Sequence, residues 1–353
     1  MTVLSLGASS FVLVAGIDPG SSEWRISFLE NGKHVCSDSE VCSSPQAPVC
    51  LLERNSVRLS ECQLIAAPSG FGLPLTRVEE LNEQKLFEVT LQPPFAPSLL
   101  GLRKALNWIR EQNLPAVILP GVKHLPTVPA HRKLGRIDIG TADKVAAAAF
   151  ALAKLWERNG VLNHSFLLAE VGSHYTAFVV VEEGEIVDGV GGANVQFGWQ
   201  AAGCLDSELA VLVKPKKRDL LRLGAVAYGA NWHSPHSATE AFLEGIIRTA
   251  AGLLAVHDTI DLIICSGLLG RRPEVLTALT TAAAPYGASV TTPPSPPPSA
   301  SEASLGAAIL ADGLCNGVHA PVVETLRIAE ARGSVFDYFP RWVLERIRLN
   351  ISI

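Results

Sequence analysis

The sequence predicts an α/β protein with two similar lobes, because a pattern of three short strands occurs twice along the chain. In each copy an apolar strand ends at a glycine-containing turn, and a second strand, a tight hairpin and a third strand follow. The strands are expected at residues 11–17, 24–29 and 34–36, and again at 166–171, 175–181 and 186–190. Since a repeated unit indicates a duplicated architecture, we predict a first lobe over residues 1–160 and a second over 161–353.

Each meander is expected to extend into a mixed sheet flanked by helices. Asn31-Gly32 is the signal of a tight hairpin in the first copy, and Glu183-Gly184 lies at the same point of the second. Hydrophobic periodicity predicts further strands at 63–67, 116–119 and 262–265, and helices at 99–111, 141–158, 205–212, 219–223, 238–256, 273–284, 301–314 and 338–349. The proline-rich segment 291–300 is expected to be an irregular linker.

The composition of the chain bears on its size, on its partners and on the state of its cysteines. The chain has 353 residues, enough for two lobes, and 48% of them are hydrophobic. Its net charge of −5 gives no basic surface for nucleic acid, and its densest cationic run, residues 214–218, reads as a solvated turn. No apolar run approaches the ~20 residues of a spanning helix, and seven scattered cysteines without a CxxC pair favour free thiols. We expect a cytoplasmic monomer or homodimer that binds neither nucleic acid nor membranes.

The turn after the first strand has the composition of a phosphate-binding loop. Gly16 and Gly20 would let the backbone approach phosphate groups, and Asp18 between them could reach a Mg²⁺ ion, usually through water. An ordinary β-turn is the alternative, because Asp-Pro-Gly is a common turn sequence.

Two later turns complete the pattern that a nucleotide bound between two lobes requires. Glu170, Gly172 and Ser173 stand at the same point of the second meander and would form a second phosphate loop. Ser266 and Gly267 follow a buried strand and precede a helix, where backbone N–H groups could face an adenosine. Plain connecting turns are the alternative for both. Their order predicts a site for ATP and Mg²⁺, whereas the GxxxxGK[ST] and GxGxxG patterns of other nucleotide folds are absent from the sequence.

Asp143 and Lys144 are the candidate catalytic residues. They begin a predicted helix whose N-terminal N–H groups also favour anions. Lys144 could neutralise charge on a transferring phosphoryl group, and Asp143 could be the base for a hydroxyl acceptor, whereas a carboxylate acceptor needs none. A first-turn carboxylate beside a surface lysine is the alternative. The candidate acceptor-binding residues, for which structural or solvated roles are the alternatives, are Ser69, Gly70, Gly72, His124 and Arg132.

Five segments resemble one known family when they are taken together. They are GIDPG at 16–20, PSGFGLP at 68–74, LPTVP at 125–129, DIGTADK at 138–144 and DGVGG at 188–192. They resemble the archaeal family described as predicted butyrate kinases, within the superfamily of acetate kinases, sugar kinases, Hsp70 and actin.

This resemblance implies a two-lobed, ribonuclease H-like fold of the actin-like ATPase type. It also implies binding of ATP and Mg²⁺ and transfer of the γ-phosphoryl group to an acceptor such as a short-chain carboxylate. By position it implies metal contacts for Asp18 and Glu170 and nucleotide contacts for Gly191 and Gly192. The Ser173-His174 pair departs from the family pattern.

Two functions remain open from the sequence. One is a small-molecule kinase, and the other is a non-catalytic switch in which ATP controls lobe closure and partner binding. Both predict ATP binding, but only the kinase predicts release of ADP that depends on an acceptor. The last predicted helix, with Phe339, Trp342, Val343 and Ile347 on one face, is expected to dock on the first lobe, with a dimer contact as the alternative.

Overall fold

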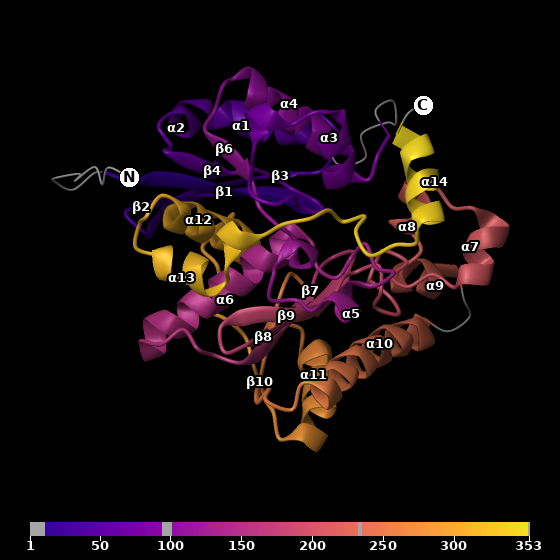
Figure 1. Cartoon of the computed structure of the whole chain (residues 1–353). Coiled ribbons are helices and arrows are strands. Elements are labelled where there is room, and N and C mark those ends of the chain that lie inside the picture. Colours follow the sequence, from indigo (N-terminus) through magenta and orange to yellow (C-terminus); the bar gives the residue numbers. More distant parts are fainter. Residues whose placement is uncertain (1–10, 94–100, 232–234, 352–353) are drawn as a thin grey trace.

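The computed structural model of the chain contains two mixed sheets with helices above, between and below them (Figure 1). It describes residues 11–93, 101–231 and 235–351. Among these residues, no helix is long and apolar enough to cross a membrane. All seven cysteines are free, and two of them, Cys62 and Cys265, are buried.

The first sheet has the strand order β3-β2-β1-β4-β6-β5. Strands β1, β2 and β3 form the predicted antiparallel meander, β4 and β6 add to it in parallel with β1, and β5 closes the edge antiparallel to β6. The bounds are β1 Leu13–Pro19, β2 Glu23–Glu30, β3 Lys33–Val41, β4 Leu64–Ala66, β5 Thr76–Arg77 and β6 Ala116–Ile118.

The second sheet has the order β11-β10-β7-β8-β9, which repeats the first sheet without its edge strand β5. Strands β7, β8 and β9 form the antiparallel meander, and β10 and β11 add in parallel with β7. The bounds are β7 Phe166–Val171, β8 Thr176–Glu182, β9 Glu185–Val190, β10 Leu262–Ser266 and β11 Ser289–Thr291. The repeated order confirms the two meanders that the sequence predicts.

Both hairpins between the second and third strands use the same kind of turn. Asn31 and Gly32 have φ values of 49° and 76°, and Glu183 and Gly184 have φ values of 51° and 85°. Two consecutive positive φ values are those of a type I′ turn, whose twist matches that of the flanking strands. The tight turns therefore fix the register of both meanders.

The helices form three layers around the sheets (Figure 1). Helices α1 and α4 cover the outer face of the first sheet, α10 and α11 cover the second, and α6 and α12 lie between the two. The bounds are α1 Ala47–Arg54, α2 Ser56–Ser60, α3 Glu83–Thr90, α4 Leu102–Glu111, α5 Ala130–Lys133, α6 Ala142–Asn159, α7 Ser207–Val213, α8 Lys217–Leu220, α9 Ala225–Asn231, α10 Pro235–Val256, α11 Pro273–Ala283, α12 Glu302–Leu314, α13 Ala320–Thr325 and α14 Arg341–Ile351.

Helix α12 packs against the first sheet although it lies late in the chain. A Cβ atom on Gly16 of β1 would lie 2.1 Å from the backbone nitrogen of Ala308, and one on Gly306 would lie 1.8 Å from the carbonyl oxygen of Ala146. Glycine is therefore required where α12 crosses β1 and where it crosses α6. The division of the chain at residue 160 remains a prediction, and the described packing joins α12 to the first lobe.

The structure differs from the predicted elements mainly at short helices and at two short strands. The elements that were not predicted are helices α1, α2, α3, α5, α9 and α13 and strands β5 and β11, and β11 ends at Thr291, where the linker was expected to begin. The linker itself, between Thr291 and the start of α12, has no regular structure, as predicted. The helix that was predicted from Leu99 begins at Leu102, after Gly101 at its N-cap, and Leu99 itself lies outside the described residues.

The segment before the last helix docks on the first lobe. The Ser334 hydroxyl donates to Glu88 at 2.6 Å, and the ring of Phe336 stacks on Phe87 with centroids 5.6 Å apart. Phe339 is half-buried under the amine of Lys123. Trp342 in α14 itself stays 60% exposed. The docking predicted for the helix is therefore made mainly by the residues that precede it.

Candidate functional site

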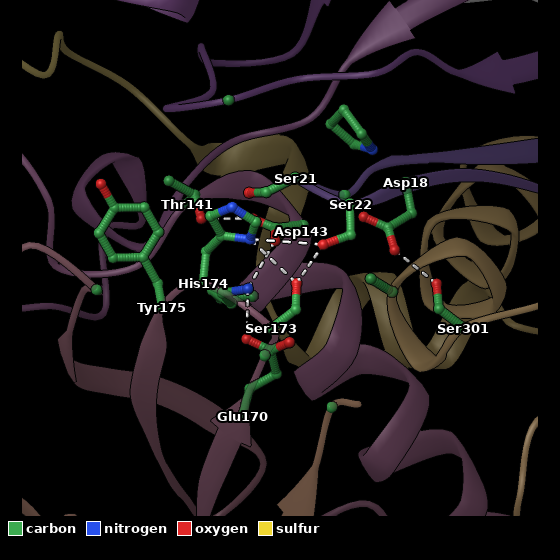
Figure 2. Close-up of a pocket in the computed structure, with 18 of the residues that line it drawn as sticks. Asp18, Ser21, Ser22, Thr141, Asp143, Glu170, Ser173, His174, Tyr175 and Ser301 are labelled. Atoms are coloured by element: carbon green, nitrogen blue, oxygen red, sulfur yellow. Dashed lines mark hydrogen bonds and ion pairs between the residues drawn. The ribbon is translucent and has the colours of Figure 1, made fainter. Parts of the chain in front are cut away.

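A cavity of about 530 Å³ lies between the two sheets, where loops from both lobes meet. Strands β1 and β7 end at it, and helices α6 and α12 begin at it (Figure 2). The predicted site residues that line it are Asp18, Gly20, Ser69, Gly70, Asp143, Lys144, Glu170, Gly172, Ser173, Gly192 and Gly267. The folding of the two lobes thus brings together residues that are as far apart as Asp18 and Gly267 in the sequence.

Asp18 projects into the cavity from the end of β1 and is only 8% exposed. Its Oδ2 atom accepts a hydrogen bond of 2.7 Å from the Ser301 hydroxyl, which lies at the N-cap of α12 (Figure 2). Burial, and then the nearby Asp143 carboxylate, raise the pKa of Asp18 to about 6. Ser301 is the one group bonded to this carboxylate among the described residues, so its charge is poorly compensated.

Lys144 joins the acidic groups of the two lobes. Its Nζ atom lies 2.7 Å from Asp143 Oδ2, on its own helix, and 2.5 Å from Glu170 Oε2, at the end of β7. Burial alone would lower the pKa of Lys144, but the two carboxylates outweigh it and raise that pKa. Burial raises the pKa of Glu170, and Lys144 opposes this. Lys144 therefore keeps its positive charge inside the cavity.

The two phosphate-loop candidates touch through hydroxyl groups. Ser22 Oγ, just after the first loop, lies 2.7 Å from Ser173 Oγ in the second, and Ser173 Oγ lies 3.2 Å from His174 Nδ1 (Figure 2). Burial lowers the pKa of His174, which favours its neutral form. The contact between the Ser22 and Ser173 hydroxyls thus connects the two lobes at the cavity.

Two helix N-termini face the cavity and add partial positive charge. Helix α6 begins beside Thr141, and α12 begins at Ser301, whose Oγ atom accepts from the backbone N–H of Ser304 at 3.0 Å. Thr141 stands at the N-cap of α6, but its hydroxyl donates to Asp143 instead of capping the helix. Free N–H groups and dipoles at such ends favour anions such as phosphates.

The glycine turn after β10 forms another wall of the cavity. Gly267 has a φ of 85°, and a Cβ atom there would lie 2.6 Å from the carbonyl oxygen of Val171. Arg271 follows it, donating to the Pro293 carbonyl at 2.9 Å and lying 3.4 Å from Glu302. This wall holds the linker and the start of α12 in place.

Sequence comparison identifies the family. A family model described as "Protein of unknown function (DUF1464)" matches residues 16–341. The chain belongs to this family. The match runs from the first phosphate-loop candidate to the start of α14 and therefore includes the whole cavity. No curated protein matches the chain in sequence.

Solved structures of short-chain acid kinases have the same fold as this family member. A propionate kinase from Francisella tularensis subsp. tularensis SCHU S4 aligns with a TM-score of 0.59 and 11% identity, covering 85% of this chain and 98% of that one. Acetate kinase from Entamoeba histolytica aligns with a TM-score of 0.55 and 12% identity, covering 77% and 85%. Acetate kinase from Porphyromonas gingivalis aligns with the same TM-score and identity, covering 85% and 98%. This likeness confirms the predicted two-lobed, actin-like ATPase fold.

Some residues predicted for the site lie outside the cavity in this family member. Ser266 is buried behind it, and Gly16 packs on α12. A Cβ atom on Gly72 would lie 2.3 Å from the backbone of Gly121, and one on Gly191 would lie within 2.0 Å of the Asp138 carboxyl group. Gly16 and Gly72 therefore allow backbone segments to pack closely, and Gly191 leaves room for the Asp138 side chain.

Neither basic residue predicted for the acceptor side reaches the cavity. His124 is completely buried, and its Nδ1 atom accepts from the backbone N–H of Gly121 at 3.1 Å. Burial lowers its pKa to about 4, so it is neutral. Arg132 lies 3.4 Å from Asp188 and donates to the Val187 carbonyl at 2.9 Å. The Arg132 side chain holds its loop against β9, and the His124 ring bonds within its own loop, so the structure places neither side chain at the cavity.

Other lining residues were not predicted as site residues. Ser22, His174 and Ser301 belong to the polar groups described above, and Phe71 and Lys217 line another part of the cavity. Sequence adjacency to the glycine turns could have indicated Ser22 and His174. The position of Ser301 at an N-cap could have indicated its exposure to the cavity. Lys217 lies in the run that reads as a solvated turn, so its sequence gives no such signal.

The lining residues fit a magnesium–nucleotide complex. No group of three or more His, Cys, Asp or Glu side chains in the described part of the chain is arranged to hold a metal alone. Mg²⁺ bound to nucleotides usually takes only one or two carboxylates, with phosphates and water as its other ligands. Asp18 is buried with little compensation for its charge, which is the condition a cation would relieve. Glu170 is already paired with Lys144, so Asp18 is the better candidate ligand.

Proposed function

We propose that this protein is an ATP-dependent kinase that transfers the γ-phosphoryl group to a small-molecule acceptor, a short-chain carboxylate. The observation that carries the proposal is the convergence of Asp18, the Lys144–Glu170 pair and two helix N-termini on one cavity between the lobes. A carboxylate that can bind a metal ion, an ammonium group and two helix dipoles therefore surround one space, as the binding of a metal–nucleotide complex requires. The acetate and propionate kinases that share the fold support the same class of reaction.

In this proposal the two turns hold the phosphates of the nucleotide. Gly20 and Gly172 line the cavity without side chains, so phosphate groups can come close to the backbone of both turns, and the N–H of Gly172 itself donates to the Tyr175 carbonyl at 2.9 Å. Asp18 would hold Mg²⁺, which neutralises phosphate charge when it is bound. The wall around Gly267 and Arg271 would receive the adenosine.

Lys144 has the role of charge stabilisation. Its ammonium group is fixed between Asp143 and Glu170, and such preorganisation places positive charge where negative charge develops on a transferring phosphoryl group. Both oxygens of Asp143 are occupied, by Thr141 and by Lys144. Asp143 is therefore poorly placed to remove a proton from a hydroxyl acceptor, which favours an acceptor that needs no base.

A carboxylate acceptor satisfies this requirement, because its oxygen is already a nucleophile near neutral pH. The cavity also has apolar walls from Phe71, Val89 and Leu102, which suit a short alkyl chain. Phosphoryl transfer would form an acyl phosphate and ADP, with the carboxylate oxygen attacking phosphorus as the bond to ADP breaks.

The test is acceptor-dependent formation of ADP. Purified protein with Mg-ATP is assayed against linear acids and the matching alcohols, with Asp18→Ala as the control. We expect ADP with acids of a few carbons, little with alcohols, and none above background in the variant. If Mg-ATP binds tightly but no acceptor produces ADP, the kinase proposal fails and the nucleotide-dependent switch replaces it.

A further inference from the structure

We propose that Lys217 binds the anionic group of the acceptor, so that the enzyme selects anions with a small apolar body. This inference rests on the proposed function, because it assigns a specificity-determining residue to the same site. Lys217 begins α8, in the second half of the chain, and lines the cavity.

The amine of Lys217, a residue of the second lobe, contacts residues of the first lobe. Its Nζ atom donates to the Thr90 carbonyl, at the end of α3, at 2.5 Å and lies 5.5 Å from the centroid of the Phe71 ring. Both partners belong to the first lobe. Lys217 is an exposed residue as a whole, but its amine lies against these two cavity-lining groups, and burial of the amine lowers its pKa to about 8.

Lys217 differs from the other cations of the cavity in having no carboxylate partner among the described residues. Across residues 11–93, 101–231 and 235–351, the other Lys and Arg side chains at the cavity are Arg25, Lys144 and Arg271. Each pairs with carboxylates: Arg25 with Glu23, Lys144 with Asp143 and Glu170, and Arg271 with Glu302.

The rest of the chain supplies no acidic side chain for Lys217 either. Residues 1–10, 94–100, 232–234 and 352–353 contain neither Asp nor Glu. A partly desolvated ammonium group held only by a carbonyl oxygen and an aromatic face is incompletely compensated. An anionic ligand would supply the missing charge.

The surroundings of Lys217 define the remainder of that ligand. The Phe71 ring and the Thr90 carbonyl contact its amine, and Val89, Gln92, Leu102 and Leu221 belong to the lining of the same cavity. Phe71 is tied to Val89 by a backbone hydrogen bond of 3.1 Å, which keeps this wall together. A single charge surrounded by apolar side chains fits a monocarboxylate with a short alkyl chain better than a sugar or a polyphosphate.

This subsite and the wall assigned to the adenosine are built from different elements. Lys217 of α8 contacts Phe71 and the end of α3, whereas the Gly267 wall follows β10 and contacts the linker and the start of α12. Asp18 and Lys144 lie in the same cavity between lobes that both walls share. The nucleotide and the anion can therefore occupy different parts of one cavity.

The test compares Lys217→Met with Lys216→Met. Methionine keeps the apolar stem over Phe71 and removes the charge, and Lys216 is an exposed lysine of the same segment that does not line the cavity. Titration calorimetry with sodium butyrate, in the presence of Mg²⁺ and a non-hydrolysable ATP analogue, measures anion binding, and butyramide is the neutral probe.

We expect wild type to bind butyrate at least 10-fold more tightly than butyramide. Lys217→Met should weaken butyrate binding roughly 10- to 100-fold, as expected for loss of a charged hydrogen-bond partner. Lys216→Met should change it less than about twofold, and the nucleotide analogue should bind all three proteins alike. In turnover, KM for butyrate should rise in Lys217→Met while kcat changes less.

Three results would overturn the inference: equal butyrate affinity in wild type and Lys217→Met, equal affinity of wild type for butyrate and butyramide, or no binding of any linear acid from formate to hexanoate. A uniform loss of affinity for both nucleotide and acid would make Lys217 a lobe contact instead. If butyrate binding depends on Lys217 but no phosphoryl transfer occurs, the proposed function alone fails. If Lys217→Met transfers phosphoryl groups with an unchanged KM, this inference alone fails.

Discussion

Replacing Asp18 by Asn should stabilise the ligand-free protein. The buried carboxyl group has its pKa raised from 3.8 to about 6, so the folded state binds its proton more tightly than the unfolded state does. A difference of about two pKa units corresponds to roughly 3 kcal/mol. Because the folded pKa is the higher one, this destabilisation is fully present above about pH 6 and disappears as the pH falls below about 4.

Asparagine keeps an oxygen that can accept from Ser301 and carries no charge, so Asp18→Asn should gain about 1 to 3 kcal/mol in the free energy of unfolding at pH 8. Urea denaturation with EDTA at pH 8, 6 and 4 measures the gain, which should shrink toward zero at pH 4. Asp258→Asn, at an exposed aspartate, is the control and should change stability by less than ~0.5 kcal/mol. A loss of stability at pH 8, or a gain that does not depend on pH, would refute the account of Asp18.

Two further substitutions test the packing and the charge of the site. Gly306→Ala places a Cβ atom 1.8 Å from the carbonyl oxygen of Ala146 and should cost about 1 to 3 kcal/mol of stability in urea denaturation. Gly252→Ala, in the open part of α10, should instead gain up to ~1 kcal/mol, and equal effects of the two would contradict the crossing of α6 and α12. Lys144→Gln should lower kcat about 10²- to 10³-fold in the ADP assay, whereas Lys154→Gln, near the other end of α6, should leave it within about twofold. Unchanged turnover in Lys144→Gln would remove this lysine from the mechanism.

The repeated meander could be predicted because its signals are local. Alternating apolar strands and the Asn31-Gly32 turn specify a hairpin within a few residues of sequence, and the structure has this turn with both φ values positive. The same pattern around Glu183 and Gly184 gives the second copy. Two copies then lead to two sheets of matching order, which is why the fold class could be predicted from the sequence.

The pairing of distant groups could not be predicted in the same way. Asp18 bonds to Ser301, which lies 283 residues later, because α12 returns to pack on β1. The local sequence around Asp18 and around Ser301 does not indicate that the two residues are in contact. The contact depends on two glycines. Gly16 allows β1 to lie close to α12, and Gly306 allows α12 to lie close to α6.

Burial is the second property that local sequence did not reveal. His124 lies in a loop, where a histidine is usually solvated, yet it is completely buried beneath the C-terminal segment. Lys217 lies in a cationic run that reads as a solvated turn, yet its amine reaches the cavity and bonds to the Thr90 carbonyl at the end of α3. Both outcomes follow from contacts between segments that are remote in the chain.

Synthesis of ATP from an acyl phosphate tests the proposed kinase activity most directly. Transfer from an acyl phosphate to ADP is the downhill direction of the proposed reaction, so even a slow enzyme would give a signal. Purified protein is mixed with Mg-ADP and butyryl phosphate, and ATP is measured by luciferase, with Asp18→Asn as the matched variant. We predict that ATP forms in proportion to the wild-type enzyme and at less than about one hundredth of that rate with the variant. No ATP above the enzyme-free background from butyryl, propionyl or acetyl phosphate would contradict the account.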